Sequence, residues 1–188
     1  MAVLKALTSG GERRPLDFYP TPPEATRALL PLIKHWPYEL WEPCCGDGAI
    51  SEVLRKVGYD VVSDDIVDYG YGGVQDFFEV DDPAHRCIVT NPPFNRADEF
   101  IRHAHKIGVS RMALILKINF WNARKRIPLW NLWRPYLIAP LTWRLDFTGA
   151  GAPHTDCMWC LWDRSYNVAL TAFEPLQKPT EQTLSQAA

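Results

Sequence analysis

The sequence predicts an α/β fold, in which a mainly parallel β-sheet carries helices on both faces. Short apolar segments typical of buried strands alternate along the chain with amphipathic segments typical of helices. Glycine, asparagine and proline follow several of the apolar segments, where strands are expected to end. With 188 residues, 47% of them hydrophobic, the chain is long enough for one domain around a single core.

The first half of the chain supplies most of the expected strands and helices. Thr21-Pro-Pro-Glu24 matches a helix start, with Thr21 as the N-cap and a proline in the first turn. Gly58 and Gly108 follow amphipathic segments and are expected to end the next two helices. The helices are predicted over 22–34, 49–57 and 97–107. The strands are predicted over 39–42, 60–63, 74–78 and 86–90.

The second half is expected to complete the sheet. A continuous apolar strand is predicted over 112–118, and Lys117 near its end faces either the core or the substrate. An irregular, basic and tryptophan-rich insert follows over 119–135. Two closing strands are then predicted over 143–147 and 157–162.

A single domain is expected over 17–174, between a flexible leader at 1–16 and a polar, disordered tail at 175–188. No apolar run is long enough to span a membrane, and the start of the chain is too weakly apolar for a signal peptide, so the cytoplasm is the expected location. The five cysteines are expected to be reduced thiols. Cys157 and Cys160 lie in an alternating apolar stretch, which favours a strand over half a zinc site, and no metal site is expected.

Positive charge is concentrated in one part of the chain, although the formal net charge is only −2. Residues 100–145 contain nine Lys or Arg, no Asp or Glu, and several tryptophans. Basic side chains interleaved with flat rings suit a nucleic acid, because they offer both phosphate contacts and stacking surfaces. A buried strand combined with a solvated helix face would give the same composition. The candidate nucleic-acid-binding residues are Trp121, Arg124, Lys125, Arg126, Trp130 and Arg134.

The first candidate motif is Glu42-Pro-Cys-Cys-Gly46-Asp-Gly48, a tight turn between an expected strand and an expected helix. Glycines at such a turn let a ligand approach the backbone, because no Cβ stands in the way. Ser51 replaces the third glycine of a dinucleotide-binding pattern, and no Lys-Ser/Thr pair completes a P-loop. Glu42 and Asp47 would repel a pyrophosphate and attract a cationic ligand with an ammonium or sulfonium group. A plain strand-to-helix turn is the alternative.

The second candidate motif is Ser63-Asp-Asp-Ile66, which ends the next strand about 20 residues after the glycine turn. A carboxylate at this place can accept hydrogen bonds from both hydroxyls of a ribose, and an apolar neighbour can cover an adenine. Either Asp64 or Asp65 is the candidate ligand. A cap of a helix or turn is the alternative.

The most specific local motif is Thr90-Asn-Pro-Pro-Phe94, which follows an apolar strand. Two consecutive prolines lack N–H donors and fix the direction of the backbone. The Asn91 amide and the Pro92 carbonyl are therefore expected to face the ligand crevice as acceptors, which suits an exocyclic –NH₂ group. Phe94 offers a flat face on which a base can stack.

In this order, the glycine turn, the acidic strand end and the Asn-Pro-Pro-Phe turn resemble the class I S-adenosylmethionine-dependent methyltransferases, and more closely those that methylate the amine of adenine. Asp17-Phe-Tyr-Pro-Thr-Pro22 also resembles the segment before the glycine turn in such enzymes. In length and in the stretches 144–149 and 154–162, the chain is similar to small adenine methyltransferases of phages and prophages. The resemblance covers 17–165 and implies a Rossmann-like fold with a mainly parallel seven-stranded sheet and an antiparallel closing strand.

The resemblance also implies S-adenosylmethionine as the cofactor. It places these residues at the cofactor: Tyr19, Pro20, Thr21, Glu42, Gly46, Gly48, Asp64, Asp65, Ile66, Asp76, Phe77 and Asn91. Asp65 is the preferred ribose ligand, with Asp64 second. Asp76 would bind the adenine amine of the cofactor, and Phe77 its ring. The catalytic turn consists of Asn91, Pro92, Pro93 and Phe94, which would hold the target amine and stack on the target base.

The implied reaction is an in-line methyl transfer to N6 of a flipped adenine in DNA, in which catalysis comes from positioning and electrostatics. Few residues separate Ile118 from Leu145, so target recognition is expected to be weak or to come from a specificity partner or a second copy of the chain. No membrane partner is expected. Methylation of adenine in RNA, methylation of a protein glutamine, and a non-catalytic nucleic-acid-binding module are the alternatives.

Overall fold

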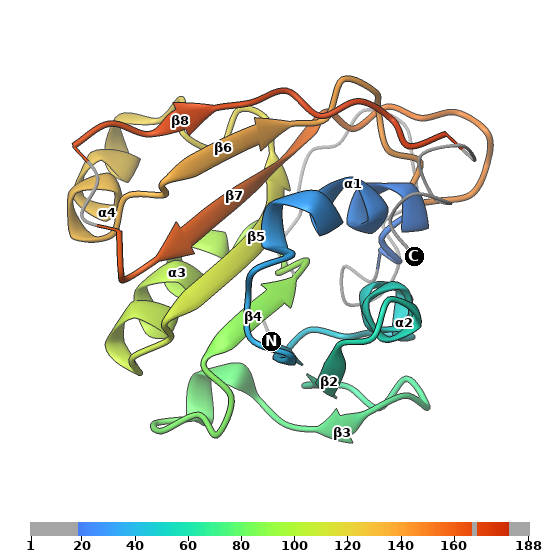
Figure 1. Cartoon of the computed structure of the whole chain (residues 1–188), viewed down its shortest axis with the longest axis horizontal. Helices are drawn as coiled ribbons and strands as arrows, with labels where there is room; N and C mark the ends of the chain where they lie inside the picture. Colours follow the sequence, from blue (N-terminus) through green and yellow to red (C-terminus); the bar gives the residue numbers. More distant parts are fainter. Residues whose placement is uncertain (1–18, 167–168, 181–188) are drawn as a thin grey trace, which may run out of the picture.

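The computed structural model describes residues 19–166 and 169–180, which form one mixed sheet with helices packed against it (Figure 1). The strands are β1 (Glu39–Glu42), β2 (Asp60–Asp65), β3 (Gly73–Val74), β4 (Cys87–Thr90), β5 (Arg111–Lys117), β6 (Leu137–Pro140), β7 (Cys157–Asp163) and β8 (Ala172–Phe173). The helices are α1 (Pro23–Ile33), α2 (Ala49–Lys56), α3 (Ala97–Lys106) and α4 (Ile127–Leu132), with 3₁₀ turns η2 (Phe77–Glu79) and η3 (Arg124–Arg126).

The strand order is β3-β2-β1-β4-β5-β7-β6-β8. All pairs from β3 to β5 are parallel, β7 is antiparallel to both β5 and β6, and β8 is parallel to β6. This order confirms the predicted mainly parallel sheet with an antiparallel strand near one edge. The sheet has eight strands and not the seven expected, because the two-residue strand β8 adds an edge beside β6.

Alternate residues of the central strands face different helices, as the period of two in a strand requires. Val89, Ala113 and Ile115 belong to a buried cluster that includes residues of α1 and α2. Ile88 and Met112 belong to a second cluster, with residues of α3 and α4. Both faces of β4 and β5 are therefore covered, which confirms the expected helices on both faces and explains why these strands are apolar throughout.

The strand predicted over 74–78 is wrong. Only Gly73–Val74 pairs with β2. Asp76 then accepts a hydrogen bond from the backbone N–H of Phe78 at 2.8 Å and caps the turn η2. An aspartate that accepts a hydrogen bond from the backbone N–H two residues ahead favours a turn over a strand, which explains why β3 does not continue.

The closing strand predicted over 143–147 is also wrong, and β6 takes its place at 137–140. Leu145 and Phe147 are buried, as the apolar alternation of this stretch predicts. The backbone nevertheless leaves the sheet, because the Asp146 carboxylate accepts hydrogen bonds from three backbone N–H groups of the loop that follows. Leu145 keeps only an isolated bridge to Thr155.

The segment after β8 lies on the sheet as far as the structure describes it. The Leu176 N–H donates to the carbonyl of Pro140 at 2.7 Å, and the Leu176 carbonyl accepts from the N–H of Thr142 at 3.0 Å. The disorder predicted from residue 175 is therefore wrong for 175–180. The predicted leader at 1–16 and residues 181–188 lie outside the described residues.

The predicted insert at 119–135 contains the short helix α4, whose Leu129 is buried against α3.

Near the start of the described residues, α1 begins at Pro23 with Pro22 as its N-cap, so Thr21 lies one residue too early for the capping role predicted for it. None of the helices in the described ranges has the length and apolar character needed to cross a membrane.

Candidate active site

The carboxyl ends of β1, β2 and β4 meet along one edge of the sheet, because β1 pairs in parallel with both neighbours. The turn after β1 contacts the end of β2, since the N–H of Cys45 donates to the carbonyl of Asp64 at 2.9 Å. The side-chain amide of Asn91, after β4, donates to the carbonyl of Tyr19 at 3.3 Å. The structure thus brings together three predicted motifs and the segment that precedes α1, at the edge where α/β sheets bind ligands.

The glycine turn has the backbone conformation expected, but the side chain of Tyr71 packs against it. Gly46 and Gly48 have positive φ values of 53° and 84°, and Gly48 is the N-cap of α2. A Cβ at Gly48 would lie 2.3 Å from the ring of Tyr71. The Tyr71 hydroxyl donates to Glu52 of α2 at 2.8 Å, which holds the ring there. The missing side chain of Gly48 therefore makes room for the Tyr71 ring. This corrects the expectation that Gly48 contacts a ligand.

Glu42 lies buried beneath the glycine turn and supports α2. Its Oε2 accepts hydrogen bonds from the backbone N–H of Ser51, at 2.8 Å, and from the Ser51 hydroxyl. Ser51 is in the first turn of α2, so Glu42 satisfies an N–H that the glycine N-cap cannot. Burial raises the pKa of Glu42 to about 8 against the opposing effect of these hydrogen bonds. The carboxyl group is therefore mostly protonated at neutral pH, which corrects the expectation of a negative charge here; Asp47 is exposed.

The two aspartates at the end of β2 have different neighbours. The Asp65 Oδ2 accepts a hydrogen bond from the backbone N–H of Gly46 at 2.9 Å, and its Oδ1 accepts from that of Val67 at 3.1 Å. The Asp64 Oδ2 accepts from the indole of Trp41 at 2.9 Å. Asp65 is thus the aspartate whose side chain contacts the glycine turn, whereas Asp64 contacts it through its backbone carbonyl. Ile66, which follows it, is 59% exposed and offers an apolar surface at this edge.

Asp76 and Phe77, both predicted at the cofactor, have different environments in the structure. Asp76 is half-buried and caps η2. Phe77 is 3% exposed and stacks on Phe100 of α3, with ring centroids 3.8 Å apart and planes 10° from parallel. Its ring belongs to the core, because η2 turns it inward, and this corrects its predicted role as a surface for the cofactor ring. The half-buried aromatic of η2 is Phe78, whose ring lies 4.1 Å from the guanidinium of Arg96.

The Asn91-Pro92-Pro93-Phe94 turn presents two unpaired acceptors. The Asn91 side-chain NH₂ donates to the carbonyl of Tyr19, so the amide oxygen Oδ1 points away from that bond. Within 19–166 and 169–180, no residue donates a hydrogen bond to Asn91 Oδ1 or to the Pro92 carbonyl. Thr90 and Pro92 are buried, which anchors the turn on β4. Both oxygens are therefore without a donor among the described residues, and the Asn91 amide is oriented by its own donor.

Phe147 is a site residue that sequence reasoning missed. It is 6% exposed, and its ring centroid lies 6.1 Å from that of Tyr19 and 6.0 Å from that of Phe94, both edge-on. The loop that presents it is held by Asp146, whose hydrogen bonds from Thr148 and from backbone N–H groups lower the pKa of its carboxyl to about 2. The apolar alternation around 145–147 shows that Phe147 points inward, but not that it reaches Tyr19 and Phe94.

Three of the six candidate nucleic-acid-binding residues, Trp121, Arg126 and Arg134, contact residues outside the insert. Arg126 pairs with Asp98 of α3 at 2.7 Å, and its guanidinium lies 4.3 Å from the ring of Phe120. Only 11% of its side chain is exposed, which corrects its expected role as a phosphate contact. Arg124 and Lys125 are exposed.

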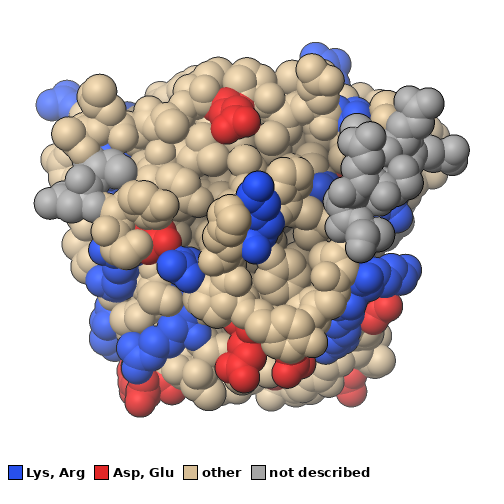
Figure 2. All heavy atoms as spheres, viewed as in Figure 1, with Lys and Arg blue, Asp and Glu red and all other residues tan. Residues whose placement is uncertain are grey.

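The predicted aromatic and basic residues that remain form a small cluster. The Trp121 indole donates to the Cys160 sulfur at 3.5 Å, and its ring meets that of Trp130 edge-on at 5.0 Å. Arg134 lies 5.4 Å from the Trp130 ring and donates to the carbonyl of Ala169. Figure 2 shows basic side chains scattered over the face in view, without one continuous patch.

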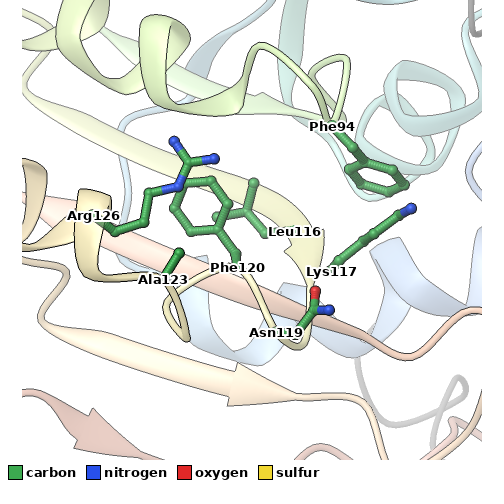
Figure 3. A pocket seen from close by; sticks show the side chains of 7 residues that line it. All are labelled: Phe94, Leu116, Lys117, Asn119, Phe120, Ala123 and Arg126. Atoms are coloured by element: carbon green, nitrogen blue, oxygen red, sulfur yellow. The ribbon is translucent and has the colours of Figure 1, made fainter. Parts of the chain in front are cut away.

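A pocket of about 190 Å³ lies beside the Asn-Pro-Pro-Phe turn, between the end of β5 and the insert (Figure 3). Its lining residues are Phe94, Leu116, Lys117, Asn119, Phe120, Ala123 and Arg126. The Lys117 ammonium lies 5.2 Å from the centroid of the Phe94 ring, and Lys117 and Asn119 are both exposed. Lys117, which the sequence left open, thus faces the candidate site and not the core.

Comparison with known proteins supports the fold. The sequence matches no protein-family model and no curated protein. Solved structures with a similar fold include a candidate RNA methyltransferase from Pyrococcus horikoshii, with a TM-score of 0.60 and 18% identity over 82% of this chain and 91% of that one. A candidate class I S-adenosylmethionine-dependent methyltransferase from Listeria monocytogenes aligns with a TM-score of 0.55 and 10% identity, over 88% of this chain and 68% of that one.

A third similar structure is the modification subunit of a candidate type I restriction enzyme from Vibrio vulnificus YJ016. It aligns with a TM-score of 0.53 and 13% identity, over 90% of this chain and 51% of that subunit. Together with the strand order, these similarities show that the chain has the Rossmann-like fold of class I methyltransferases.

Proposed function

We propose that the chain is an S-adenosylmethionine-dependent methyltransferase that modifies the exocyclic N6 amine of adenine in DNA. One observation carries this proposal: Asn91 Oδ1 and the Pro92 carbonyl are unpaired acceptors on one rigid turn, at the ligand-binding edge of a methyltransferase fold. An amine with two N–H groups is the chemical partner of such a pair. The neighbouring Phe94 ring suits a planar base, which an amine of a flexible side chain would not need.

The residues at the strand ends fit the proposed cofactor. Asp65 lies against the glycine turn with a carboxylate suited to ribose hydroxyls, and the exposed Ile66 beside it suits the face of an adenine. Asp76 would bind the adenine amine, and Tyr19, Pro20 and Thr21 would line the methionine end. The cofactor supplies an electrophilic methyl group on a sulfonium. Because burial raises the pKa of Glu42 to about 8, the exposed Asp47 and the aspartates of β2 are the acidic side chains that would attract this cationic ligand.

The proposed mechanism relies on positioning. The lone pair of an adenine amine is delocalised into the ring, which makes the amine a weak nucleophile. Asn91 Oδ1 and the Pro92 carbonyl would each accept one N–H, which localises the lone pair and directs it away from the turn. The hydrogen bond from Asn91 to Tyr19 keeps the acceptor oxygen in place. Catalysis of this kind depends on geometry and preorganised dipoles and needs no covalent intermediate.

The aromatic residues around the turn would hold the target base. Phe94 would stack on it, while Phe147 fixes the Phe94 ring from its edge. In a duplex the base would have to leave the stack, at a cost of a few kcal/mol. Exposed Arg124 and Lys125 offer phosphate contacts that offset part of this cost.

RNA is the second candidate substrate, and the similarity to the candidate RNA methyltransferase of P. horikoshii is the observation that favours it. The Asn-Pro-Pro-Phe turn suits adenine in either nucleic acid. DNA is preferred because the combined motif order of this sequence resembles DNA adenine methyltransferases, and the restriction modification subunit shares the fold.

Methyl transfer from labelled S-adenosylmethionine tests the proposal, with unmethylated DNA, total RNA and a protein extract offered in parallel. We expect label in DNA, found as N6-methyladenine by nucleoside mass spectrometry. Label in RNA or protein alone would show that the proposed substrate is wrong, and the absence of cofactor binding by calorimetry would show that the proposed enzyme class is wrong.

A further inference from the structure

We infer that the pocket between Phe94, Lys117 and Phe120 is a subsite for one nucleotide of the DNA strand, next to the nucleotide that is methylated. The inference rests on the proposed function and adds to it a place where the enzyme reads its substrate. The pocket lies in the short region between Ile118 and Leu145 and at its border with β5, where the sequence leaves little room for recognition.

The position of the pocket indicates which nucleotide it would take. Phe94 is the one residue of the Asn-Pro-Pro-Phe turn that lines it, and neither Asn91 nor Pro92 does so. The pocket is therefore beside the point where the target amine would be held. A nucleotide bound there would be a neighbour of the target, with the Phe94 ring between the two.

The size and walls of the pocket suit a single base. Its volume of about 190 Å³ is below the roughly 300–1,000 Å³ of sites for whole small molecules. Leu116 and Phe120 are buried apolar walls. Arg126, which also lines the pocket, holds Phe120 in place, because its guanidinium lies 4.3 Å from that ring and pairs with Asp98. These walls are held by the core and so are formed before a ligand arrives.

The polar groups of the pocket suit the remaining parts of a nucleotide. Figure 3 shows Lys117 and Asn119 at the same end of the pocket as Phe94. No hydrogen bond joins either side chain to another residue in the described part of the chain. The amide of Asn119 offers a donor and an acceptor to the edge of a base. The Lys117 ammonium rests against the Phe94 ring and can turn to a phosphate, and no Asp or Glu lines the pocket to repel one.

The salt dependence of DNA binding tests the role of Lys117. Fluorescence anisotropy with single-stranded and duplex oligonucleotides gives the slope of log affinity against log salt concentration. We expect Lys117→Met to make this slope shallower by about 0.7–0.9, the value for one phosphate contact. The matched control is Lys56→Met, an exposed lysine at the end of α2, for which the slope should not change. A wild-type slope in Lys117→Met would overturn the inference.

Base preference tests the role of Asn119. Competition among homopolymeric DNA oligonucleotides measures the preference of the wild type, and Asn119→Ala should reduce that preference about tenfold. Asn122→Ala, an exposed asparagine of the same insert outside the pocket, should retain it. Equal preference in the wild type and in Asn119→Ala would overturn the inference. The same effects on RNA oligonucleotides but not on DNA would overturn the assignment to DNA.

These binding measurements separate the subsite from the proposed reaction, because neither requires methyl transfer. If the expected variant effects appear while no methyl is transferred to any substrate, the pocket binds a nucleotide but the proposed function fails, and with it the assignment of that nucleotide as the neighbour of a methylated one. If N6-methyladenine forms in DNA while neither variant changes binding, the proposed function stands and the subsite fails.

Discussion

The side-chain amide of Asn91 donates a hydrogen bond to the backbone carbonyl of Tyr19 at 3.3 Å, across 72 positions of the sequence. This contact uses the donor of the amide and leaves its oxygen without a partner among the described residues. Tyr19 precedes α1, and Asn91 directly follows β4. The orientation of the candidate acceptor is therefore fixed by a segment distant in the sequence.

Glu42 makes stability depend on pH. The ordinary pKa of a glutamate is 4.5, and burial raises that of folded Glu42 to about 8, so between these values the unfolded chain has lost a proton that the folded chain keeps. The free energy of unfolding should therefore fall as pH rises through this interval and level off above it, by at most about 1.4 kcal/mol per pH unit.

Glu42→Gln removes this titration while keeping an acceptor for Ser51. Denaturant unfolding of both proteins at a series of pH values gives the difference in stability, which cancels the contributions of all other groups. Relative to the variant, the wild type should lose stability from about pH 4.5 to about pH 8. A difference that is constant or rises over this interval would contradict the account.

Phe147 should affect activity more than its burial alone suggests. Phe147→Leu keeps an apolar side chain but removes the ring that contacts Tyr19 and Phe94 edge-on. Such aromatic pairs contribute about 0.5–1.5 kcal/mol beyond their burial, so kcat/KM for DNA should fall roughly 2- to 10-fold. The measurement is steady-state methyl transfer. Phe100→Leu, in the core of α3, is the control and should lower stability with activity retained; equal losses of activity would contradict the role of Phe147.

Gly48 should tolerate alanine less well than Gly58 does. Both have positive φ, of 84° and 101°, but a Cβ at Gly58 meets nothing within 4 Å, whereas at Gly48 it would meet the ring of Tyr71. Gly58→Ala should cost about 1 kcal/mol of backbone strain, and Gly48→Ala clearly more. In denaturant unfolding, the double variant with Tyr71→Ala should be more stable than the sum of the two single changes predicts. Strict additivity would argue against the contact.

Arg126 should contribute to stability and its neighbour Lys125 to DNA binding. Arg126→Met leaves Asp98 without its partner and should lower the free energy of unfolding by about 1–3 kcal/mol. Lys125→Met should change stability by less than about 0.5 kcal/mol, because Lys125 is exposed, but should weaken DNA binding at low salt. Thermal unfolding and anisotropy measure the two effects. A destabilised Lys125→Met with a stable Arg126→Met would reverse the assignment.

Sequence periodicity predicted β1, β2, β4 and β5 of the parallel half, because each has a run of apolar residues and is followed by a polar turn. It was wrong over 74–78, where Asp76 caps the turn η2. It failed at 143–147, where the alternate buried residues belong to a loop that Asp146 holds and not to a strand. It also missed β6, which is short, ends in Pro140 and forms because β7 offers a partner strand. Pairing between distant segments is not visible in a local pattern, so the antiparallel edge was the least predictable part.

The candidate site shows the same limit. The acceptors of Asn91 and Pro92 were expected from the proline pair itself. Spacing left Asp64 and Asp65 as equal candidates, the resemblance to methyltransferases preferred Asp65, and in the structure the Asp65 side chain contacts the glycine turn. The roles of Phe77 and Glu42 depended on burial, which η2 and the packing of α2 decide. The sequence predicts a surface cation at Arg126, because its partner Asp98 lies 28 positions away in the sequence, on another helix.

The central claim is that Asn91 accepts a hydrogen bond from an adenine amine of DNA. Nucleoside mass spectrometry of DNA treated with the wild type, Asn91→Ala and Asn95→Ala tests it most directly, since Asn95 is an exposed asparagine just beyond the same turn. The account predicts N6-methyladenine from the wild type and from Asn95→Ala, and a loss of at least about 100-fold in Asn91→Ala with cofactor binding retained. Methylation of a different nucleoside, or full activity in Asn91→Ala, would contradict it.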